Sequence, residues 1–338
     1  ADNNTAVGHD ALKTNSTGAS NVAVGYNAML TNTEGANNVA MGVLALEMNT
    51  TGDGNTAIGR EALEANQTAD NNTAVGLKAL EANTTGTRNV AVGCGALASN
   101  VDDNDNTAIG FDALTVNTGQ NNTALGTCAL RGNQTANDNT GIGMRSLFTN
   151  TTGASNTGLG FSALKLNTTG ASNVAVGKNA LTANTTASDN TAFGADSLSA
   201  NTTGTCNVAV GKSALNSNTT ANYNTAIGHN VLSANTTGCF NTAVGSQSLF
   251  TNTEGCMNTV MGNSALYTNT TGDCNTALGS AALLSATTAD KNTAIGRSAL
   301  RNTTTGASNV AVGVESLTAN TTGCENTAIG CGAMCSTT

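Results

Sequence analysis

The stretch Asn173-Val174-Ala175-Val176-Gly177, followed by Lys178-Asn179-Ala180-Leu181 and then by Asn184-Thr185-Thr186, is one copy of a repeat that fills the chain. The pattern is N-[TV]-A-[VILMF]-G-x-x-A-L-x-x-N-T-T-G-x-x. Its first glycine, called here the strand glycine, recurs in twenty copies from Gly8 to Gly330, and eighteen of the nineteen intervals are 17 residues long. The remaining interval, Gly110 to Gly126, is 16 residues. Such a short and regular period predicts a solenoid.

Four rows of like residues follow from the comparison of copies. The residue three before the strand glycine is always Thr or Val (the Thr/Val row), and the residue directly before it is always apolar (the apolar row). Between them lies Ala in seventeen copies (the Ala row), and Leu or Met comes four residues after the glycine (the Leu row). Because side chains alternate along a strand, we expect the Thr/Val and apolar rows on one inward face and the Ala row on the other. The predicted core includes Leu12, Leu63, Leu181, Leu215, Val176 and Ile227.

A helix is the competing interpretation of segments such as Ala62–Asn66, but only five or six residues separate the glycine from the Asn-Thr-Thr-Gly breaker, which is too short for a stable helix. The sequence therefore predicts an all-β fold, a parallel β-solenoid or β-roll of about 20 coils of 17 residues, with two short strands and two turns per coil. We expect residues 1–338 to form a single repeat domain, since a repeat array escapes the size limit of a globular core. In the 16-residue copy we expect the strands to keep register and the turn after Asn117 to absorb the deletion.

Two asparagines mark each copy. The first Asn, four before the strand glycine, is present in all twenty copies, among them Asn55, Asn173, Asn224 and Asn309, and stacked amides predict a hydrogen-bonded column. The second Asn, seven after the glycine, is present in seventeen of nineteen copies, with Ala286 and Thr303 as the exceptions.

The second Asn also opens many N-x-[ST] sequons, so a row of glycans and an inward amide ladder are both open interpretations. The candidate glycosylation sites are Asn49, Asn83, Asn150, Asn167, Asn184, Asn201, Asn218, Asn235, Asn269 and Asn320, and further sequons occur at Asn3, Asn71 and Asn121.

The nine cysteines include one pair in stacking positions. Cys239 and Cys256 occupy the same place in neighbouring copies, where a coil spacing near 4.8 Å would allow a disulfide in an oxidising setting. Free thiols at variable surface positions are the alternative. No cysteine pattern with histidine partners indicates zinc.

Composition argues against several functions. The net charge is −9 with no basic patch, which excludes nucleic acid as a partner, and the absence of an apolar run of about 18 residues predicts no membrane insertion. The acidic run Asp102, Asp103 and Asp105 fits a solvated turn better than a calcium site, and His9 and His229 are too far apart to act together. We therefore predict a protein that is not an enzyme, with no catalytic, cofactor or metal residues.

The repeat at Asn55–Leu63, N-T-A-I-G-x-x-A-L, resembles the S-[VI]-A-[IV]-G repeats in the heads of trimeric autotransporter adhesins, whose own repeat is shorter. It is still more similar to the N-T-A-I-G-x-x-A-L-x-x-N-T-T-G arrays of phage and bacterial tail-fibre-like proteins. The adhesin heads are left-handed parallel β-rolls that trimerise, and this resemblance implies a partner chain packed against the Ala row.

The sequence and the resemblance together predict a structural subunit of an extracellular fibre or of an appendage on a cell or virion surface. Neither end of the sequence has a distinct capping segment, which indicates either missing flanking sequence or head-to-tail stacking of copies, with lateral or trimeric contact through the Ala row. One alternative is an adhesive or receptor-binding fibre head that binds glycans along the variable edge after each strand glycine, for example Arg60-Glu61 or Phe111-Asp112. Another is an ice-binding solenoid with stacked Thr pairs such as Thr185-Thr186, interrupted by Glu34, Asp102 and Glu254.

Overall fold

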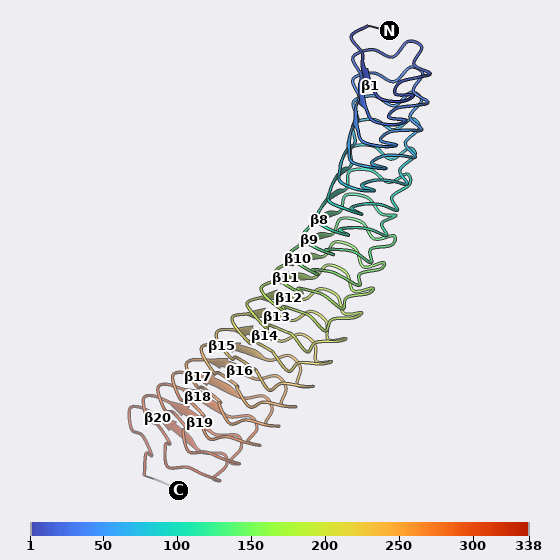
Figure 1. Ribbon diagram of the computed structural model, residues 1–338. Coiled ribbons are helices and arrows are strands. Elements are labelled where there is room, and N and C mark those ends of the chain that lie inside the picture. The colour runs from blue at the N-terminus through green and yellow to red at the C-terminus, as the bar shows by residue number, and fades with distance from the viewer. Residues whose placement is uncertain (1, 337–338) are drawn as a thin grey trace. The chain divides into compact units, whose positions relative to one another are not determined.

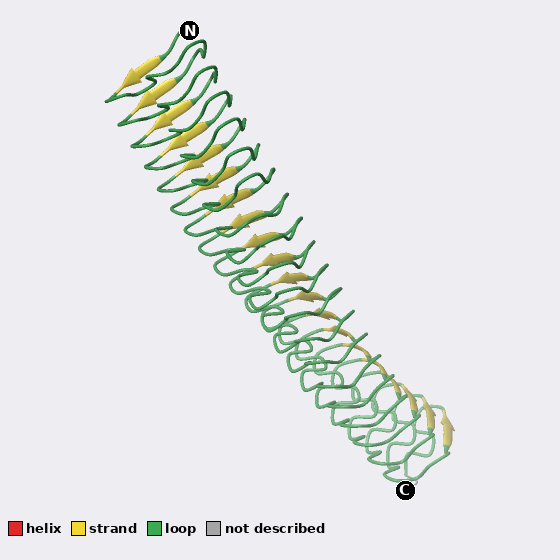
Figure 2. Ribbon diagram, turned by 90° about the vertical axis from the view of Figure 1, so that its right-hand side faces the viewer, coloured by secondary structure: helices red, strands yellow, loops and turns green. Residues whose placement is uncertain are grey.

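The computed structural model describes residues 2–336 and divides into two compact units, residues 1–170 and 171–338. Within each unit the chain winds through successive coils, and each coil contributes one strand of three residues to a parallel sheet. The strands of a unit follow one another in a row (Figure 1) and occupy one side of their coils, while turns and loops form the rest (Figure 2).

The first unit contains β1 (Thr5–Val7), β2 (Val22–Val24), β3 (Val39–Met41), β4 (Thr56–Ile58), β5 (Thr73–Val75), β6 (Val90–Val92), β7 (Thr107–Ile109), β8 (Thr123–Leu125), β9 (Thr140–Ile142) and β10 (Thr157–Leu159). The second contains β11 (Val174–Val176), β12 (Thr191–Phe193), β13 (Val208–Val210), β14 (Thr225–Ile227), β15 (Thr242–Val244), β16 (Thr259–Met261), β17 (Thr276–Leu278), β18 (Thr293–Ile295), β19 (Val310–Val312) and β20 (Thr327–Ile329). The described residues include no helix, so the predicted parallel β-solenoid is confirmed.

Neighbouring strands pair in register, so that like residues lie above like. Thr56 pairs with Thr73 in the first unit, and Val210 pairs with Ile227 in the second. The 16-residue coil keeps this register, because Thr107 of β7 pairs with Thr123 of β8. Its turn absorbs the deletion, as predicted: Asn117 donates to the carbonyl of Gly119, two residues on, at 2.6 Å, whereas the second Asn of other coils reaches three residues on.

Each strand directs its middle side chain, the residue of the Ala row, into the core. We predicted that the Thr/Val and apolar rows would face inward. Residues of the Ala row such as Ala175 and Ala226 are fully buried, while Ile227 of the apolar row is 40% exposed and Val176 is half-buried. The assignment of Val176 and Ile227 to the core is therefore wrong. The physical reason is space, because the Leu row already fills the narrow interior opposite the strand.

The Leu row and the Ala row supply the apolar part of the core. Leu63, Leu181 and Leu215 are fully buried, as predicted, and Leu12 in the first coil is half-buried. Because the Ala row lies inside its own coil, it cannot pack against another chain, and the predicted lateral or trimeric contact through the Ala row is wrong.

The Leu segment forms turns in place of the second strand that we predicted. Leu63, Leu181 and Leu215 have φ of 51°, 51° and 50°, a left-handed conformation that is rare for a residue with a branched side chain. This conformation cannot continue a strand, but it directs the side chain inward. The burial of each leucine, worth roughly 1.5–3 kcal/mol, offsets the roughly 1–2 kcal/mol cost of its backbone conformation.

The strand glycine is required by the contact between coils. Gly177 has φ of 133°, and a Cβ atom built on it would lie 2.6 Å from the carbonyl oxygen of Gly194 in the next coil. No side chain fits such a gap without displacing the backbone.

The polar half of the core consists of the two Asn columns. The column of the first Asn is confirmed, and burial of the second Asn decides for the inward amide ladder, one of the two interpretations that the sequence left open. The backbone N–H of Asn55 donates to the Oδ1 of Asn38 in the preceding coil at 2.8 Å, and Nδ2 of Asn55 donates across its own coil to the carbonyl of Ala69 at 2.7 Å. Asn224 and Asn309 make the same pair of bonds, and Asn173 donates across its coil to the carbonyl of Ala187 at 2.8 Å.

The second Asn completes the network by reaching the same carbonyl from the other side. Nδ2 of Asn66 donates to the carbonyl of Ala69 at 3.1 Å and to the Oδ1 of Asn49 in the preceding coil at 2.8 Å. Two side-chain amides thus converge on one main-chain carbonyl, and one of them continues a ladder from coil to coil.

The ladder is interrupted where the sequence departs from the pattern. Ala286 replaces the second Asn and is fully buried, and the Oδ1 of Asn269 in the preceding coil has no hydrogen-bond partner among the described residues. The carbonyl of Ala289 receives the amide of Asn275 at 2.7 Å, and alanine at 286 has no amide with which to donate a second bond.

We predict that Ala286→Asn stabilises this part of the second unit by about 1 kcal/mol, because it supplies a donor to the unpaired oxygen of Asn269. Amide hydrogen exchange of peptides that cover residues 269–306 would measure the free energy of local opening. The matched variant Asn218→Ala creates the same interruption elsewhere and should destabilise by roughly 1–3 kcal/mol. Unchanged or faster exchange in Ala286→Asn would contradict the role assigned to the ladder.

Candidate binding surfaces

The candidate glycosylation sites lie inside the coils. Asn49, Asn83, Asn150, Asn167, Asn184, Asn201, Asn218, Asn235 and Asn269 are fully buried, and Asn320 is 2% exposed. Their amide groups donate to neighbouring coils or to their own turns, as Asn235 does to the Oδ1 of Asn218 at 3.0 Å. The prediction of glycans on these residues is therefore wrong, since the nitrogen that would carry the sugar is enclosed. The sequons at Asn3, Asn71 and Asn121 are exposed.

Cys239 and Cys256 stack in neighbouring coils, as predicted, but they are free thiols. The Sγ of Cys256 accepts the backbone N–H of Cys239 at 3.1 Å, and the Sγ of Cys239 accepts that of Asn222 at 3.3 Å. Carboxylates and amides play this role in other coils, where for example Oδ1 of Asp273 accepts the N–H of Cys256 at 2.6 Å. Burial raises the pKa of the Cys256 thiol. The pair therefore acts as two hydrogen-bond acceptors in a surface column.

Three carboxylates gather on the variable edge of the first unit. Oxygens of Glu61, Glu64 and Glu81 lie within 4.8 Å of one another. Two cations already pair with two of the three: Lys78 contacts Glu61 at 3.2 Å and Glu81 at 2.8 Å, and Arg60 contacts Glu61 at 2.7 Å. The hydrogen bonds from Lys78 and Arg60 lower the pKa of Glu61, whereas burial raises the pKa of Glu64. The group is best described as an ion-pair network.

The acidic residues at 102–105 do not converge on one site, because Asp103 and Asp105 make different contacts. Asp105 forms a two-pronged ion pair with Arg88 in the preceding coil, at 2.7 and 2.8 Å, which lowers the pKa of Asp105. Asp103 takes the place of the small residue in the turn, and its carbonyl accepts the amides of Asn89 and Asn100 at 2.8 and 3.0 Å. Oδ2 of Asp103 is buried with no partner among the described residues, and desolvation raises its pKa.

The stacked threonines differ in what their hydroxyl groups do. The first Thr of a pair donates to the carbonyl of its counterpart in the next coil, as Thr202 does to Thr219 at 3.0 Å and Thr253 to Thr270 at 3.1 Å. The second Thr of a pair, such as Thr203, is exposed. Of the two columns that these Thr pairs form, only the second presents exposed hydroxyl groups, and Glu34 and Glu254 interrupt it, which weighs against an ice-binding face built from the Thr pairs.

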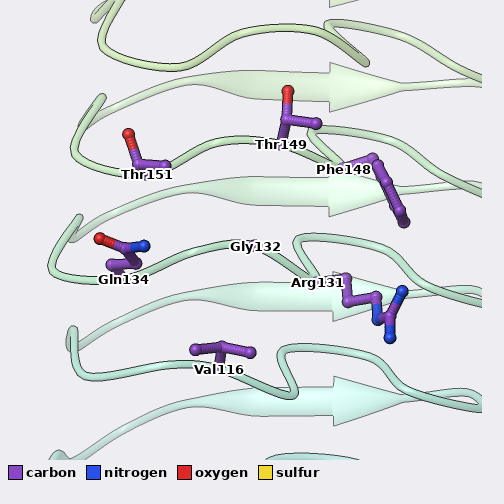
Figure 3. A pocket seen from close by; sticks show the side chains of 7 residues that line it. All are labelled: Val116, Arg131, Gly132, Gln134, Phe148, Thr149 and Thr151. Atoms are coloured by element: carbon purple, nitrogen blue, oxygen red, sulfur yellow. The ribbon is translucent and has the colours of Figure 1, made fainter.

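A shallow hollow of about 370 Å³ lies on the turn side of the first unit (Figure 3). Gly132 leaves a gap between Val116 and Thr149, and Arg131 and Phe148 stand at one end of it, with the guanidinium carbon 5.9 Å from the ring centre. Gln134 and Thr151 line the opposite end. The hollow offers an apolar floor, an aromatic ring and polar groups to a ligand, and sequence reasoning missed it. The sequence signal that could have revealed it is Gly132, since the equivalent positions in the coils before and after it carry the side chains of Val116 and Thr149.

Comparison with known protein families finds no family model that matches the chain, and no curated protein matches it. The resemblance to adhesin heads and tail-fibre arrays therefore remains a resemblance between short repeats. Residues 2–336 contain no helix that is long and apolar enough to cross a membrane.

We predict that Asp103→Asn stabilises the first unit at neutral pH by at most about 1 kcal/mol, because it removes a half-buried charge whose Oδ2 has no partner among the described residues, while solvent screens the rest. The folded-state pKa of Asp103 is raised, so the charge penalty is absent below the unfolded pKa and appears as the pH rises through the folded pKa. The gain should accordingly shrink as the pH falls towards 4.

Hydrogen exchange of peptides that cover residues 89–106, measured at pH 4 and pH 7, would test this expectation. The exposed neighbour offers a control, since Asp102→Asn should change the opening free energy by less than about 0.5 kcal/mol. A gain that is equal at both pH values would show that the charge of Asp103 is not the cause.

Proposed function

We propose that this chain is a non-enzymatic structural subunit of an extracellular fibre or surface appendage, in which copies join end to end. The observation that carries the proposal is the repetition of every bond between coils. Strand pairing, the Asn columns and the Thr hydroxyl bonds each connect a coil to the next copy of itself. A coil of a second molecule presents the same groups as the next coil of the same molecule, so the bonding pattern can continue across a junction.

The location outside the cell is supported by the resemblance of the repeats to adhesin heads and tail-fibre arrays. The described structure also suits a mechanical role, because its buried groups are committed to the bonds that hold the coils together. Assembly by continued strand pairing would add main-chain hydrogen bonds at each junction, which is the mode by which an open sheet edge takes up another strand.

A substitution in β20 would test end-to-end assembly. In the other coils, the N–H of the Thr/Val row donates away from the preceding strand, as Thr5 does to the carbonyl of Asn21. The N–H of Thr327 in β20 therefore faces the side on which another molecule would dock. We predict that Thr327→Pro, which removes this donor, leaves single molecules and abolishes filaments seen by negative-stain electron microscopy of the full chain.

Thr327→Val is the matched control, since Val occupies this row in other coils and keeps the N–H. It should form filaments like the unchanged chain. Filaments of normal length in Thr327→Pro would overturn the end-to-end mechanism.

The adhesive alternative is favoured by one specific observation, the hollow beside Gly132. Aromatic rings and planar cations are common partners of flat or partly apolar ligands such as sugars. If this alternative holds, the intact chain binds members of a glycan array, and Phe148→Ala reduces that binding at least tenfold. Phe161→Ala, which removes an exposed ring elsewhere in the same unit, should leave binding unchanged. Equal loss in both variants, or no binding by the unchanged chain, would count against a receptor-binding role for the hollow.

A further inference from the structure

The outer face of the sheet carries no charged side chain in any coil. It combines the apolar row with the Thr/Val row, in which fourteen of the twenty residues are Thr. The Thr/Val row and the apolar row lie side by side on it, and their side chains project away from the core. Ile58 is 39% exposed, Ile227 is 40% exposed and Phe193 is 56% exposed. None of the forty positions in these two rows carries a charged residue, although 10% of the chain is charged.

The size of this face exceeds what scattered surface residues produce. Ten strands at a spacing of about 4.8 Å, each presenting a width of about 10 Å, give on the order of 500 Å² in each unit. Exposed faces of this size that carry apolar side chains and no charge often serve as sites of interaction on soluble proteins. Each unit can contribute its own face to such a contact, and the two faces of a chain add up to on the order of 1,000 Å², compared with the roughly 800 Å² per partner of a stable interface.

From these observations we infer that a second copy of this chain covers the outer face, packing sheet against sheet. The periodicity of the face selects this partner. Each row presents one side chain per coil. A partner can insert a side chain between every two neighbouring side chains of a row only if its own side chains have the same spacing. A second copy of this chain has this spacing, because it is built from the same coils. Two such faces can approach to about 10 Å with their side chains interleaved, as the sheets of a β-sandwich do.

The absence of charge supports the same partner. A charged ligand or partner would find nothing on this face to pair with, whereas an identical uncharged face buries no unpaired charge when it docks. The pairing goes beyond end-to-end assembly and does not require it, since it uses the side of the coils and leaves the first and last strands untouched.

The test measures the mass of the particles per unit length. Dark-field electron microscopy of the unchanged full chain should give two chains per cross-section, and sedimentation velocity should show a concentration-dependent pair. The quadruple variant Ile58→Glu, Ile109→Glu, Ile227→Glu and Ile295→Glu places charges on half-exposed positions of the face, so the fold should survive. We expect it to give one chain per cross-section and an association constant lowered at least tenfold.

The control carries the same added charge on another side of the coil. Thr51→Glu, Thr152→Glu, Thr203→Glu and Thr305→Glu lie in the exposed column that already accommodates Glu34 and Glu254. This variant should pair like the unchanged chain, and far-ultraviolet circular dichroism should show that both variants keep the fold.

Each failure has its own signature. Long filaments with one chain per cross-section would overturn the face-to-face pairing and leave end-to-end assembly intact. Short particles with two chains per cross-section would overturn end-to-end assembly and support the pairing. Three or more chains per cross-section, or equal loss of pairing in both quadruple variants, would overturn the face-to-face contact. Single chains that bind phosphatidylcholine vesicles through Ile58 and Ile227 would also overturn it, because the face would then serve a lipid surface.

Discussion

Two asparagine side chains donate to one main-chain carbonyl in nearly every coil, and the rest of the structure depends on this convergence. In the second coil, Asn21 and Asn32 reach the carbonyl of Gly35 from opposite sides at 2.7 and 3.0 Å. The carbonyl points into the core, where it would otherwise be desolvated without a partner at a cost of several kcal/mol. The two amides satisfy it and fix the path of the turn. The residue that carries the carbonyl is Gly or Ala in most coils and Asp103 in one, and a Cβ atom built on Gly35 would lie 2.5 Å from Oδ1 of Asn32 and 2.7 Å from Nδ2 of Asn49.

The period and the rows specified most of the fold in advance. The 17-residue spacing fixed which residues stack, and the pattern of the 16-residue copy was sufficient to place its deletion in a turn. Alternation along T-A-I or V-A-V identified which side chains share a face, but it could not say which face points inward. That choice depends on the opposite wall, where leucines in a left-handed conformation occupy the interior and leave room only for alanine.

The functional interpretation was limited by the same uncertainty about inside and outside. A sequon is defined by three adjacent residues, whereas the accessibility of its asparagine depends on how the turn folds. Asn49 and Asn235 each begin a sequon, but both side chains are buried. Stacking of Cys239 above Cys256 followed from the period, but whether the sulfurs face one another or accept amides depends on side-chain direction. The hollow beside Gly132 depends on an absent side chain and on the arginine and phenylalanine of two successive coils, which no single repeat reveals.

The register across the 16-residue coil shows that each coil interacts with its neighbours through the same small set of bonds and needs nothing from coils farther away. A gene segment that encodes one whole repeat can therefore be duplicated or lost without disturbing the contacts of the coils that remain. Recombination between near-identical repeats would change the number of coils in a single step, while substitutions alter the outer columns one residue at a time. For a protein built in this way, molecular length is the property that evolution can adjust most readily.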